Sequence, residues 1–234
     1  MRIAAIDVGT NTVLLLIADV QPGGAIVPLL HAQRFPRLGQ GIDAQGYISP
    51  DAIARLIEVL REYRILLAPH KPDRIVVCGT SAVRDALNQA ELVRRVQTET
   101  GFTLEILSGE EEARWTFRGA LSGLREIERA TVIDIGGGST EIITGAHGTI
   151  ERSISLQVGS VRLKERHLLH DPPTHPDLEA AITEVEDALA SVSDFPLAGS
   201  TLVGVAGTAT SLALFFIPLF YVVILRIFRR KGSS

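Results

Sequence analysis

Two segments of this chain place an aspartate at the end of an apolar run and follow it with glycine, hydroxyl or amide residues. They occupy residues 7–12 (Asp-Val-Gly-Thr-Asn-Thr) and 134–140 (Asp-Ile-Gly-Gly-Gly-Ser-Thr). Because glycine has no Cβ, such a loop can adopt positive φ and present backbone N–H groups to an anion at close range. A carboxylate at the strand end can hold a divalent cation directly or through water. The pattern predicts binding of a phosphate together with Mg²⁺, and the alternative for one loop alone is a hairpin that needs glycine only for its turn.

The residues of the two loops divide by chemical type. We predict phosphate contacts from Gly9, Thr10, Asn11, Gly136, Gly137, Gly138 and Ser139, and metal contacts from Asp7 and Asp134. One aspartate comes from each half of the chain, so the pair can flank a magnesium ion through water. Two such loops indicate two similar half-domains that face one phosphate site.

A run of three glutamates supplies a candidate base. Ser108 and Glu111 have the spacing of a capping box, which explains Glu111 as a helix-start residue. Glu110 lies in the first turn and can complement the helix dipole. Neither role accounts for Glu112, so we predict that it orients or deprotonates a water for attack on a terminal phosphoryl group. The alternative is a solvated carboxylate at a helix start.

Other polar and aromatic residues have simpler interpretations. Arg84 follows a predicted strand and can contact a phosphate through two N–H groups, with a solvated surface arginine as the alternative. The six histidines do not have the spacing of a metal site. Trp115 and Phe117 are expected in the core rather than on a base-stacking surface.

Composition limits the classes of partner. A net charge of -4 without a dense basic stripe excludes nucleic acid as the main partner. The single Cys78 excludes an intramolecular disulfide and a cysteine metal site, and we expect it in the core. With 234 residues, 46% of them hydrophobic, the chain can form two small domains. Met1 leads directly into a predicted strand with no secretory signal, so we expect a cytoplasmic location.

Apolar periodicity and cap residues predict the elements that position these groups. The predicted strands are residues 3–8, 13–17, 25–32, 74–78, 102–107, 131–135, 140–144, 149–155 and 201–205. The predicted helices begin near Ser49, Asn88, Ser108, Val161 and Asp177. The order of strands and helices in the second half repeats that of the first.

Five motifs together resemble a known family. They occupy residues 7–12, 79–84, 108–114, 134–141 and 204–210, and the likeness extends over residues 1–211. The chain resembles the exopolyphosphatase and guanosine pentaphosphate phosphohydrolase family, within the superfamily of actin, sugar kinases and heat-shock chaperones. The resemblance implies an α/β fold of two ribonuclease H-like domains that face a cleft.

The resemblance also implies an activity and a set of roles. The expected reaction is magnesium-dependent hydrolysis of the terminal phosphate of inorganic polyphosphate or guanosine pentaphosphate. Glu112 matches the catalytic carboxylate, Asp134 the magnesium-associated aspartate and Arg84 the phosphate-binding arginine. The loop with Gly207 and Thr208 is expected to contact phosphate as well. The expected domains are residues 1–122 and 123–211, the second one incomplete at its C-terminal end.

The final segment departs from the family pattern. Residues 212–225 are almost wholly apolar, and Arg226, Arg229, Arg230 and Lys231 follow them. Three interpretations stay open: a tail that contacts a membrane through residues 212–231, a helix packed on the shortened second domain, or an altered gene end. The first would make the cytoplasmic protein membrane-associated.

Besides hydrolysis, two other functions are compatible with these residues. A small-molecule kinase could hold a nucleotide at Gly207 and Thr208, and a non-catalytic protein could bind polyphosphate or a guanosine alarmone without turnover. A homodimer is a further partner that we consider.

Overall fold

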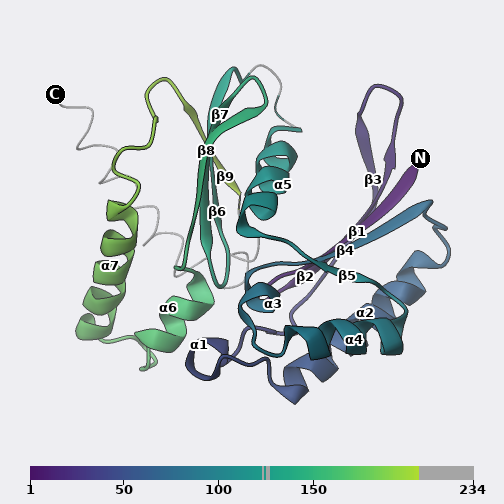
Figure 1. Cartoon of the computed structure of the whole chain (residues 1–234), viewed down its shortest axis with the longest axis horizontal. Coiled ribbons are helices and arrows are strands. Elements are labelled where there is room, and N and C mark those ends of the chain that lie inside the picture. Colours follow the sequence, from purple (N-terminus) through teal and green to yellow (C-terminus); the bar gives the residue numbers. More distant parts are fainter. Residues whose placement is uncertain (123, 125–126, 206–234) are drawn as a thin grey trace. The chain divides into compact units, whose positions relative to one another are not determined.

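The computed structural model describes residues 1–122, 124 and 127–205. Gly207, Thr208 and the apolar-basic tail of residues 212–234 lie outside the described residues. The chain divides into two compact units, Met1–Ser108 and Gly109–Ser234 (Figure 1). Each unit is built around its own sheet.

The first unit contains five strands and four helices among its described residues. In chain order these are β1 (Arg2–Val8), β2 (Val13–Val20), β3 (Ile26–Arg34), α1 (Ile42–Gln45), α2 (Pro50–Leu67), β4 (Arg74–Gly79), α3 (Ser81–Asp85), α4 (Gln89–Thr100) and β5 (Leu104–Ile106). The sheet order is β3-β2-β1-β4-β5, with β1 antiparallel to β2 and parallel to β4.

Helices α2 and α4 pack against one face of this sheet (Figure 1). The predicted start of α2 is confirmed, because the Ser49 hydroxyl accepts a hydrogen bond from the Ala52 N–H at 3.2 Å. Tyr63 of α2 is buried and donates its hydroxyl hydrogen to the Val13 carbonyl at 2.7 Å. Asn88 precedes α4 as predicted, but its side chain bonds the backbone of Ile48 instead of capping the helix.

The second unit repeats the first four strands in the same order. Its elements are α5 (Gly109–Ser122), β6 (Arg129–Ile135), β7 (Thr140–Ala146), β8 (Thr149–Leu156), α6 (Ser160–Arg166), α7 (His175–Ala190) and β9 (Thr201–Val205). The sheet order is β8-β7-β6-β9, and β9 runs parallel to β6 as β4 does to β1. The predicted α/β class with two related halves is confirmed.

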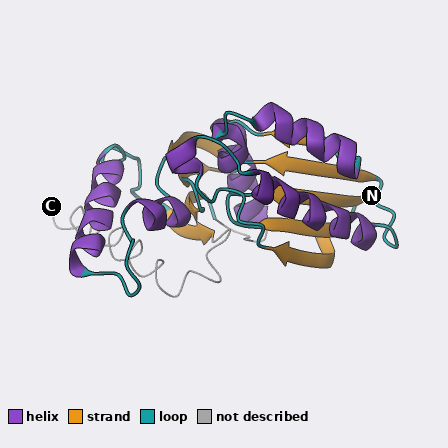
Figure 2. Cartoon of the chain, turned by 90° about the horizontal axis from the view of Figure 1, so that it is seen from below, coloured by secondary structure: helices purple, strands orange, loops and turns teal. Residues whose placement is uncertain are grey.

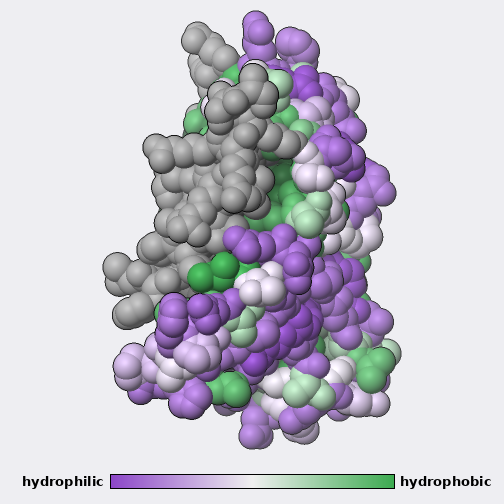
Figure 3. All heavy atoms as spheres, turned by 90° about the vertical axis from the view of Figure 1, so that its left-hand side faces the viewer, coloured by the Kyte–Doolittle hydropathy of each residue, from purple (hydrophilic) through white to green (hydrophobic). Residues whose placement is uncertain are grey.

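Helices cover both faces of the second sheet, as Figures 1 and 2 show. On one face Ile133 and Ile142 pack with residues of α6 and α7. On the other face Val132 and Ile143 pack with Ala113 and Phe117 of α5. The outer side of α7 is polar, and the surface view from this side is largely hydrophilic outside the grey atoms (Figure 3).

Helix α5 belongs to the second unit in the structure. It packs against β8 and also contacts β6, β7 and β9. The boundary between the two units in the chain therefore lies between Ser108 and Gly109. The sequence places a domain boundary after residue 122 instead. None of the described helices has the length and apolar character needed to cross a membrane.

Candidate functional site

The second glycine segment forms the turn of the β6–β7 hairpin. The Gly136 N–H donates to the Ser139 carbonyl at 2.9 Å and closes the turn. A Cβ on Gly136 would lie 3.1 Å from that carbonyl oxygen, so the turn leaves little space for a side chain. In the two strands that flank the turn, Asp134 lies directly opposite Glu141.

The three glycine carbonyls of this turn point toward the start of α6. The donors are the Ser160 N–H to Gly136 at 3.0 Å, the Val161 N–H to Gly137 at 2.9 Å and the Arg162 Nε to Gly138 at 2.9 Å. In a planar trans peptide, the carbonyl of one residue and the N–H of the next point in opposite directions. The N–H groups of Gly137, Gly138 and Ser139 therefore face away from α6. Successive N–H groups on one side of a turn can hold an anion; we call these three groups the N–H row.

Gly159 allows α6 to approach the turn so closely. A Cβ at this position would lie 2.5 Å from the carbonyl carbon and oxygen of Gly137. Any other residue at this position would push the start of α6 away from the glycine carbonyls. The motif thus extends beyond residues 134–140 to the start of α6.

A row of polar side chains crosses the face of the sheet that α5 covers. Asp134, Glu141 and Ser155 occupy successive paired positions on β6, β7 and β8. The Ser155 hydroxyl donates to Glu141 Oε1 at 2.7 Å. Gly109 lies over the same row, since a Cβ on it would be 3.7 Å from the Ser155 Cβ. The first turn of α5, which carries Glu112, therefore begins above these carboxylates.

Burial raises the pKa of Glu141 to about 7, and the negative charge of Glu112 adds to this rise. The charge of Asp134 acts in the same direction, while hydrogen bonds from Ser155 and Ser139 lower the pKa. Only 2% of Glu141 is exposed. Glu112, Asp134 and Glu141 thus form one interacting carboxylate group inside the second unit.

Asp134 and Glu141 are carboxylates that could contribute oxygen ligands to a divalent cation. Within the described ranges, no three His, Cys, Asp or Glu side chains gather closely enough to hold a metal. Magnesium usually takes only one or two carboxylates and completes its shell with water and phosphate oxygens. Asp134 and the neighbouring Glu141 supply that set of oxygen donors.

The first glycine segment forms the equivalent turn between β1 and β2. The Gly9 N–H donates to the Thr12 carbonyl at 2.9 Å, and Asp7 lies opposite Leu14. The Thr10 carbonyl accepts from the Gly39 N–H at 2.7 Å, and the Asn11 carbonyl accepts from the Arg37 N–H at 3.1 Å. By the same peptide geometry, the N–H groups of Asn11 and Thr12 face away from residues 37–39.

Arg84 lies in the short helix α3, where the sequence predicts a loop. Its Nη1 donates to the Leu107 carbonyl at 3.1 Å, and its Nε lies 3.9 Å from Asp85 Oδ1. The Arg84 side chain is 21% exposed. The alternative of a solvated surface arginine is therefore wrong, because this guanidinium is held against the backbone of its own unit.

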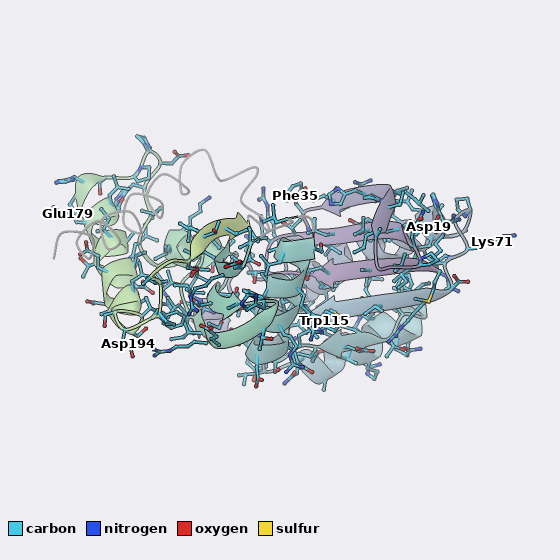
Figure 4. The ribbon with its side chains drawn as sticks, turned by 90° about the horizontal axis from the view of Figure 1, so that it is seen from above. Asp19, Phe35, Lys71, Trp115, Glu179 and Asp194 are labelled. Atoms are coloured by element: carbon cyan, nitrogen blue, oxygen red, sulfur yellow. The ribbon has the colours of Figure 1, made fainter. Side chains whose placement is uncertain are left out.

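The predicted site residues thus fall into two sets. Glu112, Asp134 and the glycine turn lie together in the second unit, and Asp7, Thr10, Asn11 and Arg84 lie in the first. The sequence missed Glu141, although a tight turn at residues 136–139 already implies that it faces Asp134. The prediction for Trp115 was wrong, since it is 60% exposed on α5 (Figure 4), whereas Phe117 is buried as expected.

Comparisons with known proteins agree on one family. The model of the Ppx/GppA phosphatase family matches residues 16–215. Exopolyphosphatase 2 of Mycobacterium tuberculosis is 41% identical over 223 residues, which is 91% of this chain and 70% of that protein. The crystal structure of the Aquifex aeolicus Ppx/GppA family member is 34% identical with a TM-score of 0.72, covering 91% of this chain and 68% of that one. An exopolyphosphatase from Cytophaga hutchinsonii is 31% identical with a TM-score of 0.83, covering 92% and 69%. This chain therefore belongs to the Ppx/GppA phosphatase family.

Proposed function

We propose that this chain hydrolyses the terminal phosphate of inorganic polyphosphate. The observation that carries the proposal is the position of the N–H row beside the carboxylates of Glu112, Asp134 and Glu141 in one unit. Phosphoryl transfer needs charge stabilisation and a positioned water more than covalent chemistry, and this arrangement offers both. The relatives named exopolyphosphatases favour polyphosphate as the substrate.

In the proposed reaction a water attacks the terminal phosphorus. Glu112 accepts a proton from this water, and the bond between the terminal phosphorus and the bridging oxygen breaks. The products are inorganic phosphate and a polyphosphate shorter by one unit. Gly137, Gly138 and Ser139 donate their N–H groups to the oxygens on which charge accumulates. Gly9, Thr10, Asn11 and Arg84 are proposed phosphate contacts of the first unit.

Mg²⁺ is the proposed metal. Asp134 would hold it, with Glu141 beside it, and the ion would neutralise phosphate charge when bound. Asp7 of the first unit stays a predicted metal contact. Guanosine pentaphosphate is a second proposed substrate, because it ends in the same phosphoanhydride group. The membrane contact, the homodimer and the cytoplasmic location stay predictions.

A phosphate-release assay tests the proposal directly. The purified chain is given polyphosphate and guanosine pentaphosphate side by side, with Mg²⁺ and then with excess chelator. We expect magnesium-dependent phosphate release, with polyphosphate the better substrate. Tight binding without turnover at saturating Mg²⁺ would identify a non-catalytic binder. Transfer from ATP to an acceptor without net phosphate release would identify a kinase.

A further inference from the structure

One side chain holds the last carbonyl of the glycine turn. Arg162, in the first turn of α6, donates from Nε to the Gly138 carbonyl at 2.9 Å. Its Nη2 donates to Gln157 Oε1 at 3.2 Å, and its backbone N–H reaches the Gly137 carbonyl at 3.2 Å. The carbonyls of Gly136 and Gly137 are held mainly by backbone N–H groups, which substitutions leave in place. Among the described residues, the Gly138 carbonyl is the one of the three that a long side chain holds.

The orientation of this carbonyl fixes the orientation of the next N–H. The Gly138–Ser139 peptide is planar, so an anchored carbonyl directs the Ser139 N–H to the opposite side. Glycine backbones have the largest conformational freedom, so the peptide would rotate readily without an anchor. Ser139 also bonds Glu141 through its hydroxyl, which links this residue to the carboxylate group.

We propose that Arg162 is a positioning residue that keeps the Ser139 N–H directed toward the phosphate; the inference rests on the proposed function. A planar guanidinium can donate to Gly138 and Gln157 at once, because its N–H groups point in fixed, different directions. Lysine is a point donor on a flexible stem and cannot reproduce both bonds. The geometry, rather than the positive charge alone, is what the turn requires.

The chain offers a matched control on the same helix. Arg166 lies one turn after Arg162, and its guanidinium pairs with Glu184 instead of the glycine turn. Arg166→Ala removes an equal charge from α6 without removing the hydrogen bond to the Gly138 carbonyl. Gln157 is exposed, so Gln157→Ala removes one further partner of Arg162 at little risk to folding.

The test measures affinity for tripolyphosphate by calorimetry, using the full chain with Mg²⁺. Losing a hydrogen bond from a charged group predicts roughly a tenfold to hundredfold weaker affinity for Arg162→Ala. Arg162→Lys should be nearly as weak, and Gln157→Ala about threefold weaker. Arg166→Ala should bind as the unchanged chain does. In steady-state assays kcat/KM for polyphosphate should fall by at least the same factor, because the Ser139 N–H also stabilises the charge that develops in the reaction.

A spectroscopic readout separates positioning from a merely structural role. In the unchanged chain, tripolyphosphate should shift the amide resonance of Ser139, and in Arg162→Lys this shift should be lost while the ligand-free melting temperature is kept. Wild-type affinity in Arg162→Lys would overturn the proposal, and so would wild-type affinity in Gln157→Ala if Arg162→Ala fails to fold. A wild-type chain that binds tripolyphosphate but releases no phosphate would overturn the proposed hydrolysis alone. A wild-type chain that does not bind it would overturn both.

Discussion

The β1–β2 and β6–β7 hairpins share one turn geometry. In each, the first glycine donates its N–H across the turn at 2.9 Å, to Thr12 in the first and Ser139 in the second. A Cβ on Gly9 would lie 3.1 Å from the Thr12 carbonyl oxygen, and a Cβ on Gly136 would lie 3.1 Å from the Ser139 carbonyl oxygen. In both turns the carbonyls are held by a neighbouring segment, so the N–H groups that follow them face the other way.

The neighbouring segments of the two turns also correspond. Gly39 follows β3 and approaches the first turn so closely that a Cβ on it would lie 2.2 Å from Thr10 Cγ2. Gly159 follows β8 and approaches the second turn so closely that a side chain at this position would clash with Gly137. The two units therefore repeat the same backbone arrangement, in which the turn between the first two strands packs against the segment that follows the third strand.

The side chains at equivalent positions are what differ. Asp7 lies opposite Leu14, whereas Asp134 lies opposite Glu141. Ser139 bonds Glu141, while the buried hydroxyl of its counterpart Thr12 has no hydrogen-bond partner among the described residues. The comparison teaches that the fold supplies two similar turns but that, among the described residues, the set of three interacting carboxylates lies beside the second turn.

The largest effect is expected at Glu112, which lies over the second hairpin. Glu112→Gln removes the proposed base but keeps the size and polarity of the side chain. We expect phosphate release from polyphosphate to fall about 10²- to 10⁴-fold, with little change in melting temperature. Glu110→Gln is the control, because Glu110 lies in the same helical turn, is largely exposed and pairs with Arg114. Undiminished activity in Glu112→Gln would remove this residue from the mechanism.

A direct comparison of the two strand-end aspartates comes next. Asp134→Asn should lower phosphate release about 100-fold, because it removes a charge beside Glu141 where a hard cation is expected. Asp7→Asn should lower it only about tenfold, since Asp7 faces Leu14 and has no carboxylate in the paired position across the strands. Phosphate release is measured as Mg²⁺ is titrated. Equal losses in the two variants would mean that the two aspartates matter equally and that the second hairpin has no special role.

The sequence predicted the backbone of this site better than its side-chain contacts. Apolar runs and glycine-rich turns located both hairpins, because a buried strand and a tight turn leave strong local signals. Glu141 was missed because its importance depends on cross-strand register and on burial by α5. Arg162 was missed because its acceptor is a glycine carbonyl 24 positions earlier in the chain.

The exposed position of Trp115 shows why burial cannot be predicted from residue type alone. Ala113 and Phe117 are four residues apart, so they share the buried stripe of α5. Trp115 lies two residues from each of them and therefore projects from the opposite side of the helix. Its type indicated the core, but the helical period places it outside.

The third prediction concerns the pH dependence of stability. The pKa of Glu141 in the folded chain is about 7, above the ordinary 4.5, so the folded state binds this proton more tightly than the unfolded state does. The Glu141 contribution to stability is therefore present at low pH and decreases as pH rises from about 4.5 to about 7. Its size is about 3 kcal/mol.

Glu141→Gln does not titrate, so this variant should lack that decrease. Denaturant unfolding of both proteins in metal-free buffer, from pH 4.5 to pH 8, gives the comparison. The stability difference should grow in favour of Glu141→Gln as pH rises. Parallel profiles would show that Glu141 has an ordinary pKa and that the second hairpin differs less from the first than we infer.

The smallest expected effects test the serine and threonine at equivalent turn positions. Thr12→Val replaces a buried hydroxyl, 3% exposed and without a described hydrogen-bond partner, by a group of the same shape. It should raise the free energy of unfolding by up to about 1 kcal/mol, because an unsatisfied buried hydroxyl is costly. Ser139→Ala should lower it by about 1 kcal/mol, because it removes a hydrogen bond to Glu141. Urea unfolding at pH 8, where Glu141 is mostly ionised, measures both free energies. If both variants are less stable than the unchanged chain, the Thr12 hydroxyl has a hydrogen-bond partner, and the two turns are more alike than we infer.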